Sequence, residues 1–536
     1  MMRAVLVFAL AAVLLFAGLS PDGGGAIQPL AAGRVIAASG GDNVPFVLPI
    51  GDVVHFVSPT GKDSANGRTP ATAWATANHR VNCGDVIIAE PGSYGQLSGW
   101  GPVSKCPSIS GGVDGTGGIY FAVLLCAGPN LGACNVSGGG TNNAIDVNKN
   151  NWAVEGFNAS APGAGQAFFA DACNTSSILH HVAFINDVAT NSGYGFDAGH
   201  CGNRFGNDYV AFVGSIAQNS NAYTGGASFC GSAVDVNAPQ NFDTNAGTHI
   251  FVHGMFMFAN LGPTPVSGCT SDIEPLMFDT WDGFAYTQQG IASDNLIWHN
   301  GGFGIHIFYQ AMHVATLTMV FDHNTVFDSC ANEVAGMFNC SEMNFGTRSA
   351  QWNISVTNSI LRTGRATGAG GNPVYATNYD TIPASTSFPP MLTGNLLWGT
   401  ATACEGICAP NTRQPISISC CNGTLLTPPS GTFEDPAFTS TFDLLTNWIG
   451  APTCSGFADV ASCMGWNYSS QAATSLTPIS DLTATSVHSG GKGYRPPGPC
   501  APDPNFPMWL KGIVYLHWNG TSLTENAGLV NGPCGM

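Results

Sequence analysis

The chain has 536 residues, and 69 glycines and 33 prolines stand beside a hydrophobic fraction of 44%, so it is neither collagen nor a wholly disordered protein. Only 9% of the residues are charged, which favours strands and turns over helices. The formal net charge is −18 and no basic stripe occurs, so the sequence excludes nucleic acid as a partner.

The first 30 residues have the pattern of a secretory signal peptide. Arg3 precedes an almost continuous apolar run over residues 4–19, and Ser20-Pro-Asp-Gly23 follows. We therefore expect a secreted protein, extracellular or periplasmic, with no transmembrane segment once residues 1–30 are removed. All 18 cysteines lie downstream of this segment, and an even number in an exported chain predicts disulfides rather than zinc sites.

Between residues 144 and 341 a short motif recurs in which a polar residue follows an apolar one and usually precedes another. In a β-strand this alternation turns the apolar residues inward and the polar residue outward. Phe169-Ala-Asp171 is a looser copy. The motif predicts an outward ladder of polar side chains, formed by Asp146, Asp197, Asp235, Asp279, His306 and Asn339.

A second motif, asparagine followed by a variable residue and two apolar ones, recurs farther along the chain. Its copies begin at Asn295, Asn324, Asn358 and Asn395, at steps of 29, 34 and 37 residues. Short strands at this spacing, without helical periodicity, indicate the coils of a parallel β-solenoid. The four asparagines are expected to stack in one line, because amide side chains at a bend can hydrogen-bond along a stack.

Residues 401–536 differ from the repeats, since they contain eight cysteines and several proline pairs. A solenoid needs a cover for its last apolar cross-section, and a disulfide-stapled C-terminal cap would supply one. A separate small domain is the alternative.

The opening of the repetitive region resembles a known superfamily. Phe56-Val-Ser-Pro-Thr-Gly-Lys62-Asp63, then Asn66-Gly-Arg-Thr-Pro70, and later Gly84-Asp85-Val-Ile-Ile-Ala-Glu-Pro91-Gly92-Ser-Tyr94 resemble the start of secreted proteins of the pectin-lyase-like superfamily. The resemblance implies an all-β fold, a right-handed parallel β-helix over residues 52–400 including an N-terminal cap, followed by the Cys-rich C-terminal cap region. Members of that superfamily include polysaccharide lyases, glycoside hydrolases, epimerases and adhesins. The Trp-x-Asp-His run of pectate lyases and the motif set of polygalacturonases are both absent.

The acidic ladder is the best candidate for a site. If Asp235 and Asp279 occupy neighbouring coils about 4.8 Å apart, their carboxylates repel, so one takes a proton or a cation sits between them. A proton would give a glycosidase acid–base pair. Ca²⁺ bound by Asp235 and Asp279 would suit a lyase, and no other cofactor is expected. The alternative is a polar face that contacts only solvent.

Residues 272–282 hold four carboxylates beside Trp281, which is expected to face outward. Aromatic rings stack on sugars while carboxylates bind hydroxyls or cleave the bond. For His306 a hydrogen bond within the stack is the alternative role. The predicted catalytic residues are Asp235, Asp279, Asp282 and His306, and the predicted substrate-binding residues are Trp281, Phe308 and Arg348.

These observations predict a secreted, monomeric, carbohydrate-active protein whose partner is a polysaccharide, acting as a lyase or a glycoside hydrolase. The rival hypothesis is a non-catalytic β-helix, an adhesin or structural protein that uses the same face only to bind. Fold alone does not separate the two.

Overall fold

The fold was analysed in a computed structural model of the chain. The structure describes residues 35–36, 46–47, 53–108, 119–128, 130–139, 142–163, 165–199, 205–220, 231–262, 273–281, 284–309, 316–332, 340–347, 351–365, 367–368, 374–380, 391–399, 416–418, 493–495, 503, 505–510, 513 and 515–525. The predicted signal peptide and the eight cysteines of residues 401–536 lie outside these ranges.

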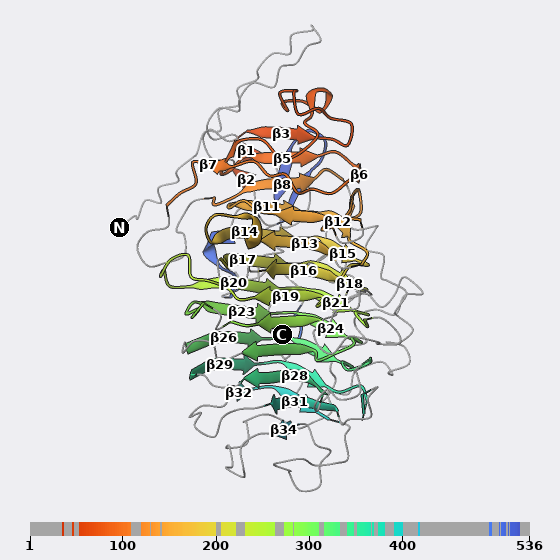
Figure 1. The fold of residues 1–536 in the computed structure, drawn as a ribbon, viewed down its shortest axis with the longest axis vertical. Coiled ribbons are helices and arrows are strands. Elements are labelled where there is room, and N and C mark those ends of the chain that lie inside the picture. The colour runs from red at the N-terminus through yellow and green to blue at the C-terminus, as the bar shows by residue number, and fades with distance from the viewer. Residues whose placement is uncertain are drawn as a thin grey trace, which may run out of the picture.

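Three long parallel sheets stack along one axis (Figure 1). The chain visits them in turn: β13 (Gln166–Asp171) joins the nine-stranded sheet, β14 (Leu179–Ile185) the eleven-stranded sheet and β15 (Val188–Thr190) the ten-stranded sheet, before β16 (Tyr194–Gly199) returns to the first. Each coil thus adds one strand to every sheet. This confirms the predicted all-β, right-handed parallel β-helix.

The strands of the three sheets are short and follow one another at regular intervals. The nine-stranded sheet consists of β10 (Ile145–Val147), β13, β16, β19 (Val234–Asn237), β22 (Leu276–Asp279), β25 (Ile305–Tyr309), β28 (Cys340–Thr347), β31 (Val374–Asp380) and β34 (Ile416–Ile418). The eleven-stranded sheet consists of β3 (Val54–Val57), β5 (Val86–Ala89), β8 (Ala122–Cys126), β11 (Trp152–Glu155), β14, β17 (Asn207–Val213), β20 (Thr248–His253), β23 (Gln289–Ser293), β26 (Thr316–Asp322), β29 (Gln351–Thr357) and β32 (Met391–Thr393). The ten-stranded sheet consists of β6 (Gly92–Tyr94), β9 (Cys134–Ser137), β12 (Phe157–Ser160), β15, β18 (Ile216–Gln218), β21 (Phe256–Phe258), β24 (Leu296–Trp298), β27 (Thr325–Phe327), β30 (Ile360–Arg362) and β33 (Leu396–Trp398).

The remaining elements are small. They are the antiparallel pairs β1 (Val35–Ile36) with β2 (Phe46–Val47) and β35 (Leu516–Trp518) with β36 (Leu523–Glu525), the parallel pair β4 (Val81–Asn82) with β7 (Val103–Ser104), and the 3₁₀ turns η1 (Pro70–Thr72), η2 (Ala172–Asn174) and η6 (Met508–Leu510). No helix in the described ranges is long and apolar enough to cross a membrane.

The interior is filled by side chains that repeat from coil to coil. Phe168 stacks on Phe196 with ring centroids 4.7 Å apart, and Phe184 stacks on Phe212 at 5.9 Å. All four rings are fully buried. Because each coil buries its apolar face only against its neighbours, the alternating pattern of the sequence translates directly into a continuous core.

The asparagine line is confirmed in part. The backbone N–H and the amide of Asn295 both donate to Asn324 Oδ1, at 3.1 and 2.9 Å. The next position is Ser359, whose hydroxyl accepts from the Asn324 backbone and whose own N–H donates to Asn395 Oδ1. The prediction for Asn358 is therefore wrong by one residue.

Asn358 lies instead in a neighbouring column of left-handed backbone. Its φ is +49°, and the positions that precede the corner in other coils are Gly214, Gly254, Asp294, His323 and Gly394, all with positive φ. Asparagine tolerates this conformation better than most residues do, so both columns favour the same residue type for different reasons.

Three disulfides are present in the described part of the chain: Cys83–Cys106, Cys126–Cys134 and Cys330–Cys340. Each closes a loop of no more than 23 residues in sequence. They support the expectation that the cysteines form bridges.

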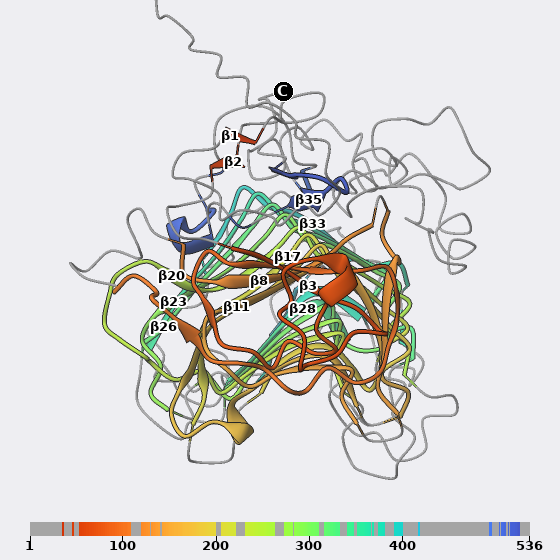
Figure 2. The same ribbon diagram turned by 90° about the horizontal axis from the view of Figure 1, so that it is seen from above.

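The described residues among 493–525, which we call the C-terminal segment, lie along the outside of the eleven-stranded sheet. Arg495 forms ion pairs with Asp294, and Trp509 donates from its ring nitrogen to Thr248 O. Farther along, Trp518 meets Phe56 of the first coil edge to face. Viewed down the axis, this segment lies outside the stacked coils (Figure 2). The described part of the predicted cap region thus covers a side of the solenoid.

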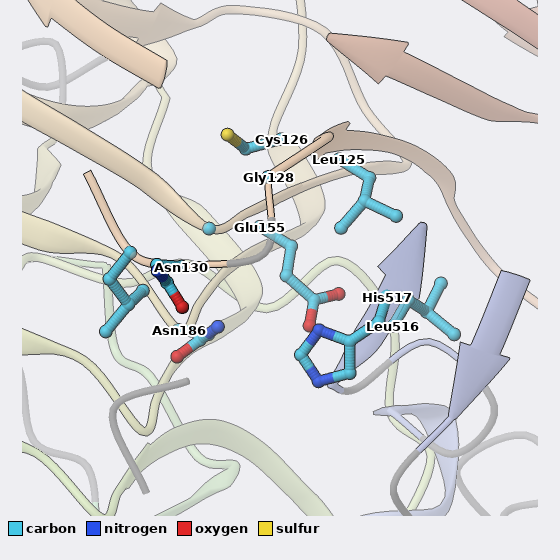
Figure 3. Close-up of a pocket in the computed structure, with 10 residues that line it drawn as sticks. Leu125, Cys126, Gly128, Asn130, Glu155, Asn186, Leu516 and His517 are labelled. Carbon is cyan, nitrogen blue, oxygen red and sulfur yellow. The ribbon is translucent and has the colours of Figure 1, made fainter. Parts of the chain in front are cut away.

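One small pocket opens between this segment and the solenoid. Leu125, Glu155, Asn186 and His517 are among its lining residues, and the Glu155 carboxylate points toward the His517 ring (Figure 3). Glu155 is fully buried at this junction.

Candidate functional site

The outer face of the nine-stranded sheet carries a column of polar side chains. The strand register aligns Asp146, Phe169, Asp197, Asp235, Met277, His306, Asn344 and Asn378 from coil to coil. Four predicted members, Asp146, Asp197, Asp235 and His306, therefore share one column. Asn339 lies outside the described residues.

Asp279 does not belong to this column. Strands β19 and β22 are neighbours, as expected, but Asp235 pairs with Met277 and Asn237 pairs with Asp279. The Asn237 amide donates to Asp279 Oδ2 at 3.0 Å, and the Thr280 hydroxyl donates to Oδ1 at 2.6 Å. A two-residue slip keeps Asp279 outward, because strand side chains alternate with period two. The predicted direct pairing of Asp235 with Asp279 is thus wrong, and the two lie diagonally, roughly 8 Å apart at Cα.

The prediction that Trp281 faces outward is also wrong. Its side chain is 1% exposed, its ring nitrogen donates to Val236 O at 3.1 Å, and its ring packs edge to face against Phe278 and Tyr286. Thr280, just before it, has a φ of +51°, so the chain turns and the next side chain enters the core. Trp281 is a core residue and offers no surface to a sugar.

The remaining predicted residues divide into two groups. Phe308 is half-buried beside His306, with ring centroids 5.8 Å apart. Asp282 and Arg348 lie outside the described residues.

Three carboxyls gather at the N-terminal end of the column, and we call Asp146, Asp171 and Asp197 the carboxyl cluster. Asp171 ends β13, two residues beyond Phe169, and its Oδ1 accepts from the Cys173 backbone at 2.7 Å. All three carboxyls are buried, with exposures of 7%, 2% and 6%. The cluster is therefore a desolvated group of like charges on three successive coils.

Burial sets the ionisation of this cluster. It raises the pKa of Asp146 to about 7, and the negative charge of Asp171 and a hydrogen bond between the two carboxyls add to the rise, while the Asn143 amide opposes it. Burial also raises the pKa of Asp197 to about 7, opposed by the Gln166 amide and reinforced by the charges of Asp171 and Asp279. At neutral pH the cluster therefore retains a proton.

Neutral side chains frame the cluster. The amide of Asn143 donates to Asp146 Oδ2 and that of Gln166 to Asp197 Oδ2, each at 3.2 Å. Phe169 is half-buried and lies over Gly199, where a Cβ would meet its ring at 2.6 Å. This ring supplies an apolar wall beside the three carboxyls.

The ability of these residues to hold a cation was tested on their geometry. Asp146 Oδ1 is buried without a hydrogen-bond partner, so one ligand atom is available, and carboxylates are the ligands that Ca²⁺ prefers. Three carboxylate oxygens do not converge within 4.8 Å here. Among the described residues such convergence occurs only at His253, Asp294 and Asp503, where Arg495 already supplies the positive charge. Asp146, Asp171 and Asp197 could therefore hold a cation only if further ligands, such as water or substrate oxygens, completed its coordination.

The sequence motif does not single out Asp171 as a site residue. Its motif copy was recognised, but Phe169 takes the column position, which places Asp171 one outward step farther along the strand. Glu274, which accepts from His306 Nδ1 at 3.1 Å, was counted only as one of four nearby acids. A contact across 32 residues leaves no periodic signal.

Comparisons with known proteins extend to the fold. No protein-family model and no curated protein matches the sequence. Among solved structures, pectate lyase Pel9A is similar over 75% of this chain and 86% of its own, at 16% identity and a TM-score of 0.44. A rhamnogalacturonan lyase is similar over 64% and 87%, at 14% identity and a TM-score of 0.30. The GH136 lacto-N-biosidase from Eubacterium ramulus is similar over 64% and 67%, at 11% identity and a TM-score of 0.30. These likenesses concern the β-helix alone, and the function is argued from the site.

Proposed function

We propose that this protein is a secreted enzyme that cleaves a polysaccharide by general acid–base catalysis at the carboxyl cluster. One observation carries the proposal: Asp146 and Asp171 are hydrogen-bonded carboxyls, and the pKa of Asp146 is raised to about 7. Purely structural surface carboxylates have no need of such an arrangement, whereas a catalytic acid must hold its proton near the working pH.

The three carboxyls divide the work. The Asp146–Asp171 pair holds the proton that is donated to the glycosidic oxygen as the bond breaks. Asp197, two coils from Asp146 and thus roughly 10 Å away, takes the proton of an attacking water. A separation of this size leaves room for that water and favours inversion at the anomeric carbon. Phe169 keeps the site apolar and offers a ring face to a sugar.

A cation-assisted elimination is the second candidate, and the unpartnered Asp146 Oδ1 favours it. Ca²⁺ held by Asp146, Asp171 and Asp197 would neutralise a uronate carboxylate. The outward column of the nine-stranded sheet holds no Lys or Arg in its described rungs, so neither can serve there as the base for such a reaction. A binding protein without catalysis is the third, and the raised pKa values argue against it.

Digestion of a panel of neutral and uronate-containing glycans tests the proposal. Hydrolysis creates reducing ends without ultraviolet absorbance, whereas elimination creates unsaturated products that absorb, and a chelator arm shows whether Ca²⁺ is needed. We expect reducing ends alone, with the inverted anomer seen by proton NMR. Absorbing, chelator-sensitive products would establish the lyase, and binding without any cleavage would establish the adhesin.

A further inference from the structure

His306 has a fixed orientation on the outer face of the nine-stranded sheet. Its Nδ1 lies 3.1 Å from Glu274 Oε1, and Glu274 is 1% exposed. A carboxylate oxygen only accepts, so the proton of the imidazole belongs on Nδ1. The other nitrogen, Nε2, then presents a lone pair as a hydrogen-bond acceptor.

This acceptor faces a donor on the next coil. The register pairs His306 with Asn344, whose Oδ1 accepts from the Asn378 amide at 3.0 Å. That bond fixes the amide so that Asn344 Nδ2 is turned the other way. A Cβ on Gly346 would lie 3.0 Å from His306 Nε2 and 3.4 Å from Asn344 Nδ2, so both nitrogens border the space above this glycine.

Gly346 has no conformational reason to be glycine. Its φ is not among the positive values, so alanine could adopt this backbone, but its Cβ would lie 3.0–3.5 Å from His306 Nε2, Asn344 Nδ2 and Ile307 O, and the closest of these atoms would have to shift. Phe308 pairs with Gly346 across the two strands, and its ring centroid lies 5.8 Å from that of His306. An acceptor and a donor beside this glycine, next to Phe308, suit a small neutral group that both donates and accepts.

We infer that His306, Asn344 and Gly346 form a subsite that binds a hydroxyl group of a sugar, held in place by Glu274 as a positioning residue. A hydroxyl donates to His306 Nε2 and accepts from Asn344 Nδ2, while the Phe308 ring contacts the sugar. The subsite lies three coils from Asp197 along one column, roughly 14 Å away. It rests on the proposed function in that the same glycan strand would occupy both places.

The variant Gly346→Ala tests the subsite without touching the carboxyl cluster. We expect KM for long oligosaccharides to rise about tenfold, the loss of one well-placed hydrogen-bonded contact, with kcat unchanged. Cleavage of the shortest substrates, which reach only the cluster, should stay as it is. Gly139→Ala is the control, because nothing lies within 4 Å of its Cβ. An unchanged KM for long substrates overturns the inference.

The variant Glu274→Gln tests the positioning role. Nitrogen-15 NMR of the histidines should show His306 with its proton on Nδ1 in the native protein and a mixture of tautomers in the variant. A native spectrum with the proton on Nε2 overturns the inference.

Asp146→Asn lacks the proposed acid, so calorimetry on this background measures binding of a long oligosaccharide without cleavage. Comparing it with and without Gly346→Ala separates the two hypotheses. If the wild-type protein cleaves no glycan but Gly346→Ala still weakens binding of a long oligosaccharide, the subsite stands and the proposed reaction fails. If cleavage occurs and Gly346→Ala binds like its parent, the reaction stands and the subsite fails.

Discussion

Two outer faces of the same solenoid have opposite chemistry. In the eleven-stranded sheet, β5 (Val86–Ala89) is apolar at every position and β17 (Asn207–Val213) is apolar from Tyr209 onward, and both strands are buried throughout. Strands of the nine-stranded sheet, such as Ile145–Val147, alternate and place a carboxyl outward. Continuous apolar runs belong to sheets covered on both sides, and alternation belongs to sheets with one polar face.

The difference explains where the C-terminal segment lies. Apolar outward side chains such as Ile88, Leu125 and Val213 pack in one cluster with Trp509 and Leu516 of that segment. The outward positions of the nine-stranded sheet are polar instead, although Asp146, Asp197 and Asp235 are also buried, so this face differs from the packed one in its polarity. Whether the outward residues of a strand are apolar or polar therefore separates the face covered by the C-terminal segment from the face that carries the candidate site.

The largest expected effect is a loss of turnover when a carboxyl on the polar face of the nine-stranded sheet is replaced. Asp171→Asn removes one member of the carboxyl pair, so we expect turnover to fall by about 10²–10⁴-fold, the usual worth of a general acid or base. Thermal unfolding should hardly change, because the variant removes a like-charge repulsion and keeps the shape.

Asp279→Asn is the matched comparison, since this carboxyl is outward on the same sheet but bonded to Asn237 and Thr280. It should keep most of the activity. A loss in Asp279→Asn with full activity in Asp171→Asn would return the site to the residues first indicated by the sequence.

A substitution on the covered face of the eleven-stranded sheet should instead lower the stability of the fold. Trp509 is 1% exposed, donates to Thr248 O and lies against Phe121, His181 and Tyr209. Trp509→Ala should lower the free energy of unfolding by about 3–5 kcal/mol, measured by denaturant titration with the disulfides intact. Met508→Ala, at a neighbour that is 40% exposed, should cost little. Equal effects of the two variants would mean that the segment does not pack as described.

How far the sequence predicts each face depends on the range of the interactions. The alternation of Ile145-Asp-Val147 is local, so it identifies an outward carboxyl without knowledge of the fold. The register is not local. Asp279 is offset by two residues from Asp235, and a two-residue slip leaves an alternating pattern unchanged, so the pattern carries no signal for it.

Trp281 shows a second limit. Alternation would have continued outward, but Thr280 adopts positive φ, and a threonine gives no signal for it. The covering of the eleven-stranded sheet could be expected from its apolar strands, whereas the identity of the cover comes from contacts such as Trp509 with Thr248, 261 residues apart.

The pH dependence of stability should distinguish the faces by a smaller amount. Asp146 and Asp197 have pKa values raised from 3.8 to about 7, so the folded state holds their protons more tightly than the unfolded chain does. Their contribution is complete below pH 4 and is lost as the pH rises toward and through 7. We expect a loss on the order of 2 kcal/mol between pH 4 and pH 8. Asp197→Asn should flatten this slope in denaturant titrations, and Ca²⁺ at pH 8 should restore stability only if the cluster binds it. A slope that persists in Asp197→Asn and Asp146→Asn would place the titrating groups elsewhere.

The last comparison concerns the corner that leads out of the covered sheet, where two asparagines of one sequence motif have different roles. The Asn295 side chain lies in the buried line, donates to Asn324 and to Val252 O and accepts from Met255 N–H, so Asn295→Gly should cost about 2–3 kcal/mol through three lost hydrogen bonds and added chain entropy. Asn358 has a φ of +49°, which glycine adopts without strain, and its amide makes one partly buried bond of 3.2 Å to Asp322. Its carbonyl, which accepts from Gly493 of the C-terminal segment, is kept in any variant. Asn358→Gly should therefore change the free energy of unfolding by no more than about 0.5 kcal/mol, because relief at positive φ offsets the lost bond. Equal costs of the two variants would put Asn358 back in the buried line and move Ser359 out of it.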